Sequence, residues 1–233
     1  MRASIRLGRI LGIPIEIHVS WIFIFSLLMY LLVVQFDDSR LRWPLAQRWV
    51  VAVIGVALFF LSVLAHELSH SAVALYKGIP VRSITFFIFG GVSRLDEEPV
   101  SPLIEFIVAL VGPLISIVLA GMFGLGWYLL GKGDSSLEVV FLLLAWTNLS
   151  LGLFNLIPGY PLDGGRMLHA GIWGFTGSQY KATWIASGIG QVVGLALGLG
   201  GVFISVFVAV VGVMWLGFIG MFLFFIARQG FLK

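Results

Sequence analysis

Long apolar stretches separated by short polar segments dominate the chain, and a spanning helix needs only about 20 apolar residues. Four such stretches cover residues 19–36, 49–76, 103–130 and 139–156. Residues 182–227 contain no Asp, Glu, Lys or Arg, so they have room for two further spans with a turn near Gly200–Ser205. The pattern therefore predicts an all-α polytopic membrane protein with about six transmembrane helices.

One apolar segment is too short to span as a helix. It covers residues 81–95, follows a Lys77-Gly-Ile-Pro80 break, and contains a run of aromatic and β-branched residues before two glycines. This composition predicts a short re-entrant or β-hairpin segment after the second span. We expect one integral membrane domain over residues 1–233, with a core over residues 1–175 and a C-terminal span pair over residues 182–227.

The composition supports the membrane assignment and limits the chemistry. Hydrophobic residues make up 60% of the chain, charged residues 11%, and the mean hydropathy is +1.07. Because there is no cysteine, disulfides and thiolate metal sites are excluded, and a metal must bind through His, Asp, Glu or water. The net charge of +3 is too small and too dispersed to indicate nucleic acid as a partner.

The basic residues predict the orientation in the membrane. If the N-terminus is cytoplasmic, ten Lys and Arg residues lie on the cytoplasmic side and four on the other. This excess follows the rule that positive charges stay inside. The second and fourth spans then both end in the cytoplasm, so an active site built at these ends lies towards the cytoplasmic side of the cell membrane.

The second apolar stretch contains an H-E-x-x-H pattern formed by His66, Glu67 and His70. Positions i and i+4 share one face of a helix, so both imidazoles can bind one metal ion. A charged group at membrane depth costs about 2.5–3.5 kcal/mol or more, and such groups usually mark a site. The spacing therefore predicts zinc, with Glu67 as general base. A structural hydrogen-bonded cluster is the alternative.

A third ligand is needed, because a catalytic zinc takes three protein ligands and one exchangeable water. Asp163 is the best candidate, since Pro161, Gly164 and Gly165 beside it favour an irregular backbone that can turn a carboxylate inward. We expect one Zn²⁺ per chain. In this arrangement Glu67 would accept a proton from water and pass it to the leaving amine.

The segment from Asn155 to Arg166, which reads N-L-I-P-G-Y-P-L-D-G-G-R, together with H-E-L-S-H at 66–70, resembles the site-2 protease family of intramembrane zinc metalloproteases. The resemblance extends to residues 4–14, 89–92 and 112–113, and the last third of the chain matches only in being apolar. It implies that His66, His70 and Asp163 hold zinc, that Glu67 activates water, and that Asn155 helps to bind the scissile carbonyl. A helix C-cap is the alternative for Asn155, and Asn148 is a weaker candidate for the same role.

The resemblance implies an intramembrane zinc endopeptidase that cuts within or near the transmembrane segments of single-span, membrane-anchored regulatory proteins. An unwound substrate could bind the short segment after the second span by strand addition. The alternative is that this segment is a hairpin with a purely structural role. The candidate substrate-binding residues are Phe86, Phe87, Phe89, Gly90 and Gly91.

Two other functions stay open: a non-catalytic membrane adaptor, and a metal- or haem-binding transporter-like protein. The expected partners are single-span membrane protein substrates and the lipid bilayer, and a homo-oligomer stays open. The chain stops at Lys233, so it is either minimal or lacks a C-terminal regulatory domain. Of the remaining polar residues, we expect His18 at the membrane interface and Glu105 as a boundary residue. We expect His169 on a solvent-facing helix position, and a position behind the metal ligands is the alternative.

Overall fold

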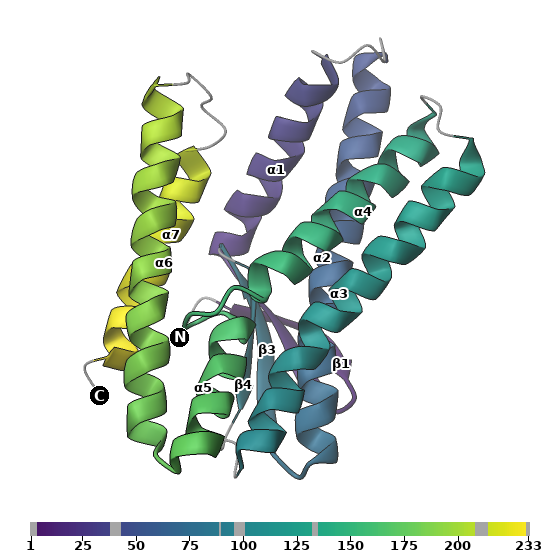
Figure 1. The fold of residues 1–233 in the computed structure, drawn as a ribbon. Helices are drawn as coiled ribbons and strands as arrows, with labels where there is room; N and C mark the ends of the chain where they lie inside the picture. The colour runs from purple at the N-terminus through teal and green to yellow at the C-terminus, as the bar shows by residue number, and fades with distance from the viewer. Residues whose placement is uncertain are drawn as a thin grey trace. The chain divides into compact units, whose positions relative to one another are not determined.

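The computed structural model describes residues 4–37, 43–88, 90–95, 101–131, 135–207 and 214–231. The chain forms two compact units, one made of residues 1–98 and 114–152 and the other of residues 99–113 and 153–233. The helices, shown in Figure 1, are α1 (Ser20–Asp37), α2 (Leu45–Tyr76), α3 (Pro102–Leu130), α4 (Ser136–Asn155), α5 (Asp163–Thr176), α6 (Gln179–Phe207) and α7 (Met214–Phe231).

Within the described part of the chain, α1, α2, α3, α4 and α6 are long and apolar enough to cross a membrane. Helix α7 adds a shorter apolar stretch, Leu216–Gly230, so a sixth span stays a prediction. The expected turn near Gly200–Ser205 is wrong, because these residues lie inside α6. A glycine inside a helix costs only about 1 kcal/mol relative to alanine, and the packing of Gly201 on Gly217 of α7 favours a continuous helix here.

The chain also forms a four-stranded sheet, whereas the sequence predicts only a short re-entrant or β-hairpin segment after the second span. Its strands are β1 (Ser4–Ile10), β2 (Ile13–His18), β3 (Val81–Phe87) and β4 (Gly90–Leu95), in the spatial order β1-β2-β3-β4. Strands β2 and β3 pair in parallel, whereas β1–β2 and β3–β4 pair antiparallel. Strand β3 is therefore an inner strand, and β4 is an edge.

Alternating residues explain why the N-terminal segment pairs with this sheet. Ile13 and Ile15 are two apart, so they point to the same face of β2, and both are buried. Ile15 stands opposite Ile84 of β3, which is fully buried. Because this alternation is short and lies close to basic residues, the sequence pattern alone does not predict strands β1 and β2.

In the first unit the long helices pack against one another and against the sheet. Helix α1 packs against α2, and β3 and β4 pack against the same helix α2. Buried apolar side chains from α1, α2, α4 and the segment before α2 form a cluster comprising Val33, Phe36, Trp43, Val51, Ala52, Val140 and Leu144. Because β4 contacts α2 directly, the strand lies beside the helix that carries the H-E-x-x-H pattern.

In the second unit α6 and α7 lie side by side over much of their length (Figure 1). Glycines make this approach possible. A β-carbon on Gly220 would lie 2.2 Å from the backbone nitrogen of Gly198, and one on Gly201 would lie 2.5 Å from that of Gly217. Small residues that let two backbones approach are typical of helix pairs in membranes.

Candidate metal centre

Helix α2 positions both histidines of the H-E-x-x-H pattern. His66 and His70 are one helical turn apart, and both side chains are buried. Their Nε2 atoms lie 3.2 Å apart, and the two rings stand at 82° to each other. Two nitrogen ligands of one tetrahedral zinc are about 3.3 Å apart when each Zn–N bond is about 2.05 Å. The two Nε2 atoms therefore already have the separation that a shared zinc requires.

A buried serine orients the first histidine. The Oγ of Ser116 in α3 lies 2.9 Å from Nδ1 of His66, and the Ser116 side chain is fully buried. When Nδ1–H donates to this hydroxyl, Nε2 keeps its lone pair and can bind a metal. Sequence analysis did not identify Ser116, because the two residues are 50 positions apart and a lone serine in an apolar helix carries no motif.

Strand β4 contacts the predicted general base. The hydroxyl of Ser93 donates to Oε2 of Glu67 at 2.7 Å. Gly91 lies on the same strand, and a β-carbon there would stand 2.7 Å from Cγ of Glu67. Glu67 is half-buried, so its side chain is partly exposed to solvent. Ser93 is a second residue that sequence analysis did not identify.

Asp163 is the first residue of α5, and its side chain is buried. The loop before it turns tightly, with the backbone N–H of Leu162 donating to the carbonyl of Gly159 at 3.0 Å. A β-carbon on Gly164 would lie 2.3 Å from the carbonyl oxygen of Leu156. One on Gly165 would lie 2.2 Å from the carbonyl carbon of Gly159. The Asp-Gly-Gly sequence is therefore explained by close packing of the loop on the start of α5.

His66, His70 and Asp163 form a buried group whose ligand atoms all lie within 4.8 Å of one another. Two imidazoles and one carboxylate are a donor set that suits zinc, and a catalytic zinc takes three protein ligands. They are the three residues that the sequence predicts as ligands. The donor chemistry and the Nε2 separation of the histidine pair fit zinc.

Asn155 is the last residue of α4 and is half-buried. Its place at the helix end agrees with the C-cap alternative, and its contact with a scissile carbonyl stays a prediction. Asn148 lies two turns earlier and is fully buried. Its amide donates to Oγ of Ser62 at 3.1 Å and to the carbonyl of Leu144 at 2.8 Å. Asn148 therefore ties α4 to α2 in the first unit.

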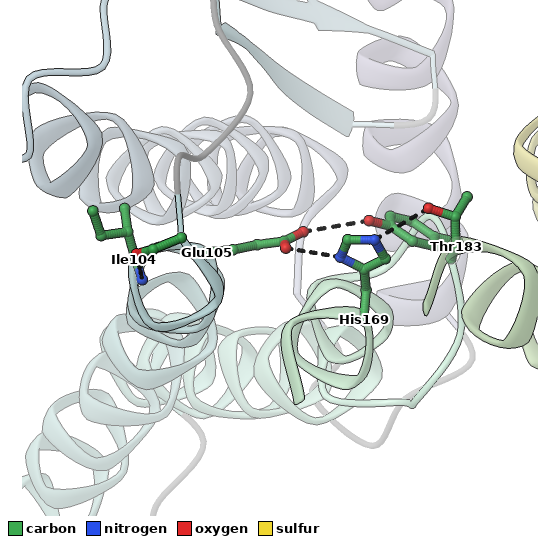
Figure 2. Close-up of polar contacts among 6 residues, drawn as sticks. Ile104, Glu105, His169 and Thr183 are labelled. Atoms are coloured by element: carbon green, nitrogen blue, oxygen red, sulfur yellow. Dashed lines mark hydrogen bonds and ion pairs between the residues drawn. The ribbon is translucent and has the colours of Figure 1, made fainter. Parts of the chain in front are cut away.

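The expectation for His169 is wrong, as Figure 2 shows. His169 is buried in the second unit, where its Nδ1 lies 2.8 Å from Oε2 of Glu105 and its Nε2 lies 3.1 Å from Oγ1 of Thr183. Glu105 is in the first turn of α3, as a boundary residue would be, but it is buried and also accepts from the Tyr160 hydroxyl at 3.4 Å. Because the partners are 64 and 14 residues away, only the fold brings them together.

His18 ends β2 two residues before α1 begins at Ser20. Its Nδ1 accepts from the backbone N–H of Ser20 at 3.2 Å and lies 2.8 Å from Oγ of the same serine. It therefore satisfies an otherwise unpaired group at the start of α1.

The candidate substrate-binding residues lie on and beside the β3–β4 hairpin. Phe86 is buried, pairs with Ile17 on one side and Gly91 on the other, and contacts the ring of Phe60. Strand addition at Phe86 is therefore blocked, and a substrate strand would have to pair with β4, which starts at Gly90. Phe87 is half-buried at the end of β3. Phe89 lies outside the described residues.

Comparison with known proteins places the chain in a family. The model of Peptidase family M50 matches residues 54–132 and 132–200. A solved structure, the Site-2 Protease from Methanocaldococcus jannaschii, superposes with a TM-score of 0.65 at 32% identity, covering 98% of this chain and 95% of that one.

Two curated relatives carry the names of zinc metalloproteases. One, from Synechocystis sp., is 40% identical over 96% of this chain, and Rip3 from Mycobacterium tuberculosis is 38% identical over 98% of it. This chain spans 58% and 59% of the length of these two relatives. The residues matched by the family model include both the H-E-x-x-H pattern and the Asp-Gly-Gly turn, and the chain therefore belongs to Peptidase family M50, the site-2 protease family.

Proposed function

We propose that this chain is an intramembrane zinc endopeptidase that hydrolyses peptide bonds within or near the transmembrane segments of single-span membrane proteins. One observation carries the proposal. The ligand atoms of His66, His70 and Asp163 lie within 4.8 Å of one another, and Glu67 adjoins the first of them in the chain. The five long apolar helices and the family assignment make the chain an integral membrane protein, which supports a membrane-embedded substrate.

The proposed chemistry assigns a task to each residue. His66, His70 and Asp163 would hold one zinc ion. Bound there, zinc would supply Lewis-acid activation, which brings the pKa of water to about 7. Glu67 takes a proton from the attacking water as the water oxygen bonds to the scissile carbonyl carbon. It then delivers that proton to the amide nitrogen as the C–N bond breaks.

The side-chain amide of Asn155 is proposed to donate to the carbonyl oxygen as negative charge develops on it. A donor of this kind typically contributes about 10²- to 10³-fold to the rate, because it is already aimed at the charge that develops in the transition state. The proposal is supported by the position of Asn155, eight residues before Asp163 in the segment that resembles the family motif.

We also propose that the substrate binds in extended form along β4. The carbonyls of a helical substrate are already hydrogen-bonded, so a helix must unwind before hydrolysis. An edge strand offers the main-chain groups that hold an extended peptide. Support comes from the sheet order, which makes β4 an edge strand, and from the contacts of Gly91 and Ser93 with Glu67.

Cleavage of a panel of single-span substrates by the purified protein in liposomes tests the function. Wild type is compared with Glu67→Ala and with Glu16→Gln, an acid on β2 whose exposed pairing with Arg6 contributes little. We expect wild type and Glu16→Gln to cleave, Glu67→Ala to lose cleavage, and a zinc chelator to abolish cleavage reversibly. Zinc-loaded protein that cleaves no substrate in a Glu67-dependent way would favour a non-catalytic adaptor instead.

We propose a cytoplasmic N-terminus, with the site towards the cytoplasm. The chain has no cysteine, so single cysteines can be introduced without a background. Leu45 and Tyr76 stand at opposite ends of α2, and both are exposed. In intact cells, a membrane-impermeant maleimide should label Leu45→Cys and not Tyr76→Cys. The reverse pattern would contradict the proposed orientation.

A further inference from the structure

Strand β4 presents two residues to the side chain of Glu67. Gly91 and Ser93 are two positions apart, so they point to the same face of the strand. The missing side chain at Gly91 leaves the space that Cγ of Glu67 fills, and the hydroxyl of Ser93 reaches the end of the same side chain. Contacts at both ends restrict the rotamers of Glu67.

The hydrogen bonds around Ser93 run in one direction. The hydroxyl of Ser71, which is fully buried on α2, donates to Oγ of Ser93 at 3.2 Å. A serine hydroxyl has a single proton. The Ser93 proton has two acceptors within reach, Oε2 of Glu67 at 2.7 Å and the Glu67 backbone oxygen at 3.4 Å. The shorter contact to a charged acceptor is the stronger one, so the proton is directed to the carboxylate.

We propose that Ser93 is the positioning residue of the general base. Its hydroxyl, oriented by Ser71, binds one carboxylate oxygen of Glu67 and leaves the other oxygen to accept the proton of water. This inference rests on the proposed function, because only in hydrolysis does Glu67 act as a base. The hydrogen bond between Ser93 and Glu67 can be measured without any cleavage.

The placement of Ser93 also links the base to the substrate. Strand β4 has β3 on one side and is an edge on the other. A substrate strand paired along that edge would lie beside the strand that holds Glu67. Binding of an extended substrate would therefore steady β4, Ser93 and the carboxylate together, so that Ser93 acts on turnover rather than on substrate affinity.

Steady-state cleavage by Ser93→Ala, Ser93→Thr and Ser83→Ala tests this role. Ser83 is a buried serine on the neighbouring strand β3 and provides the matched control. Small displacements of a reacting group can cost about 100-fold in rate. We expect Ser93→Ala to lower kcat about 10- to 100-fold at unchanged KM and unchanged zinc content. Ser93→Thr, which keeps the hydroxyl, should restore most of the rate, and Ser83→Ala should match wild type.

Infrared spectroscopy of the metal-free protein gives a readout independent of cleavage. The difference between wild type and Glu67→Gln isolates the carboxylate bands of Glu67. We expect Ser93→Ala to shift these bands, and Ser71→Ala to shift them less. If Ser93→Ala does not fold, the shift of the Glu67 carboxylate bands in Ser71→Ala tests the inference instead, and unshifted bands in that variant contradict it.

Unshifted bands, or a kcat for Ser93→Ala equal to that of wild type, would overturn the inference. A loss of zinc that parallels the loss of rate in Ser93→Ala would also overturn it, because Ser93 would then support the fold of the site in general. Absence of cleavage by wild type contradicts the proposed function instead, and the infrared shift still tests the hydrogen bond.

Discussion

Gly91 packs directly on Glu67. A β-carbon at Gly91 would stand 2.7 Å from Cγ, 3.3 Å from Cδ and 3.4 Å from Oε1 of that side chain. Non-bonded carbon atoms prefer about 3.5–4.0 Å, so even a methyl group at Gly91 requires Glu67 to move. The side chain of Glu67 on α2, the predicted general base, therefore explains why the second residue of β4 is a glycine.

Gly91→Ala should displace the Glu67 carboxylate and lower kcat about 10- to 100-fold, because the base no longer meets the water in the required geometry. Zinc content should stay at the wild-type level, since neither histidine contacts the new methyl group closely. Gly8→Ala is the control, because a β-carbon on that glycine of β1 meets nothing within 4 Å. An active Gly91→Ala enzyme would show that Glu67 need not occupy this position.

Ser116→Ala should weaken zinc binding about 10- to 100-fold, the range for loss of a residue that orients a metal-ligating histidine. The cause is the loss of the hydrogen bond to Nδ1 of His66, which frees the ring to rotate or change tautomer. Competition with a chromophoric chelator measures the affinity. Ser187→Ala removes an equally buried serine of α6 and should leave the affinity unchanged. Equal affinities for the two variants would contradict the orienting role.

Gly164→Ala should destabilise the start of α5 and reduce zinc retention, because its methyl group would overlap the carbonyl oxygen of Leu156. Gly171→Ala on the same helix meets open space. It should be neutral or stabilise by up to about 1 kcal/mol, since alanine is the better helix former. Thermal unfolding in detergent together with bound-zinc analysis separates the two variants. Similar behaviour of both would refute the close-packing explanation of the Asp-Gly-Gly turn.

Glu105→Ala should destabilise the protein by about 1–3 kcal/mol, because Nδ1 of His169 and the Tyr160 hydroxyl lose a buried acceptor. Glu105→Gln keeps one acceptor oxygen and should cost less. Chemical or thermal unfolding of the detergent-solubilised protein measures the difference. A Glu105→Ala variant as stable as wild type would mean that the buried contacts in Figure 2 contribute no net stability.

Local patterns predicted the parts of the site that lie on one element. The i,i+4 spacing of His66 and His70 required only a helix, and the structure supplies α2. The glycines after Asp163 indicated an unusual backbone, and the structure shows why side chains are excluded there. The long apolar stretches likewise predicted α1 to α4 to within a few residues.

Contacts between distant residues could not be predicted in this way. Ser93 and Ser116 have no motif, and each acts on α2 only because folding brings it there. Likewise, His169 follows Arg166 on a short helix, which suggested a solvent-facing position, whereas Glu105 and Thr183 bury it. Pairing of the N-terminal strands with β3 also depends on the tertiary fold.

Zinc stoichiometry measured beside substrate cleavage tests the central claim most directly. The account predicts one zinc per chain in wild type and in Glu67→Gln, but cleavage by wild type alone. It also predicts that Asp163→Ala loses both zinc and cleavage, because Asp163 belongs to the same group of ligand atoms as the two histidines. Zinc held by Asp163→Ala as tightly as by wild type, or cleavage by Glu67→Gln at the wild-type rate, would contradict it.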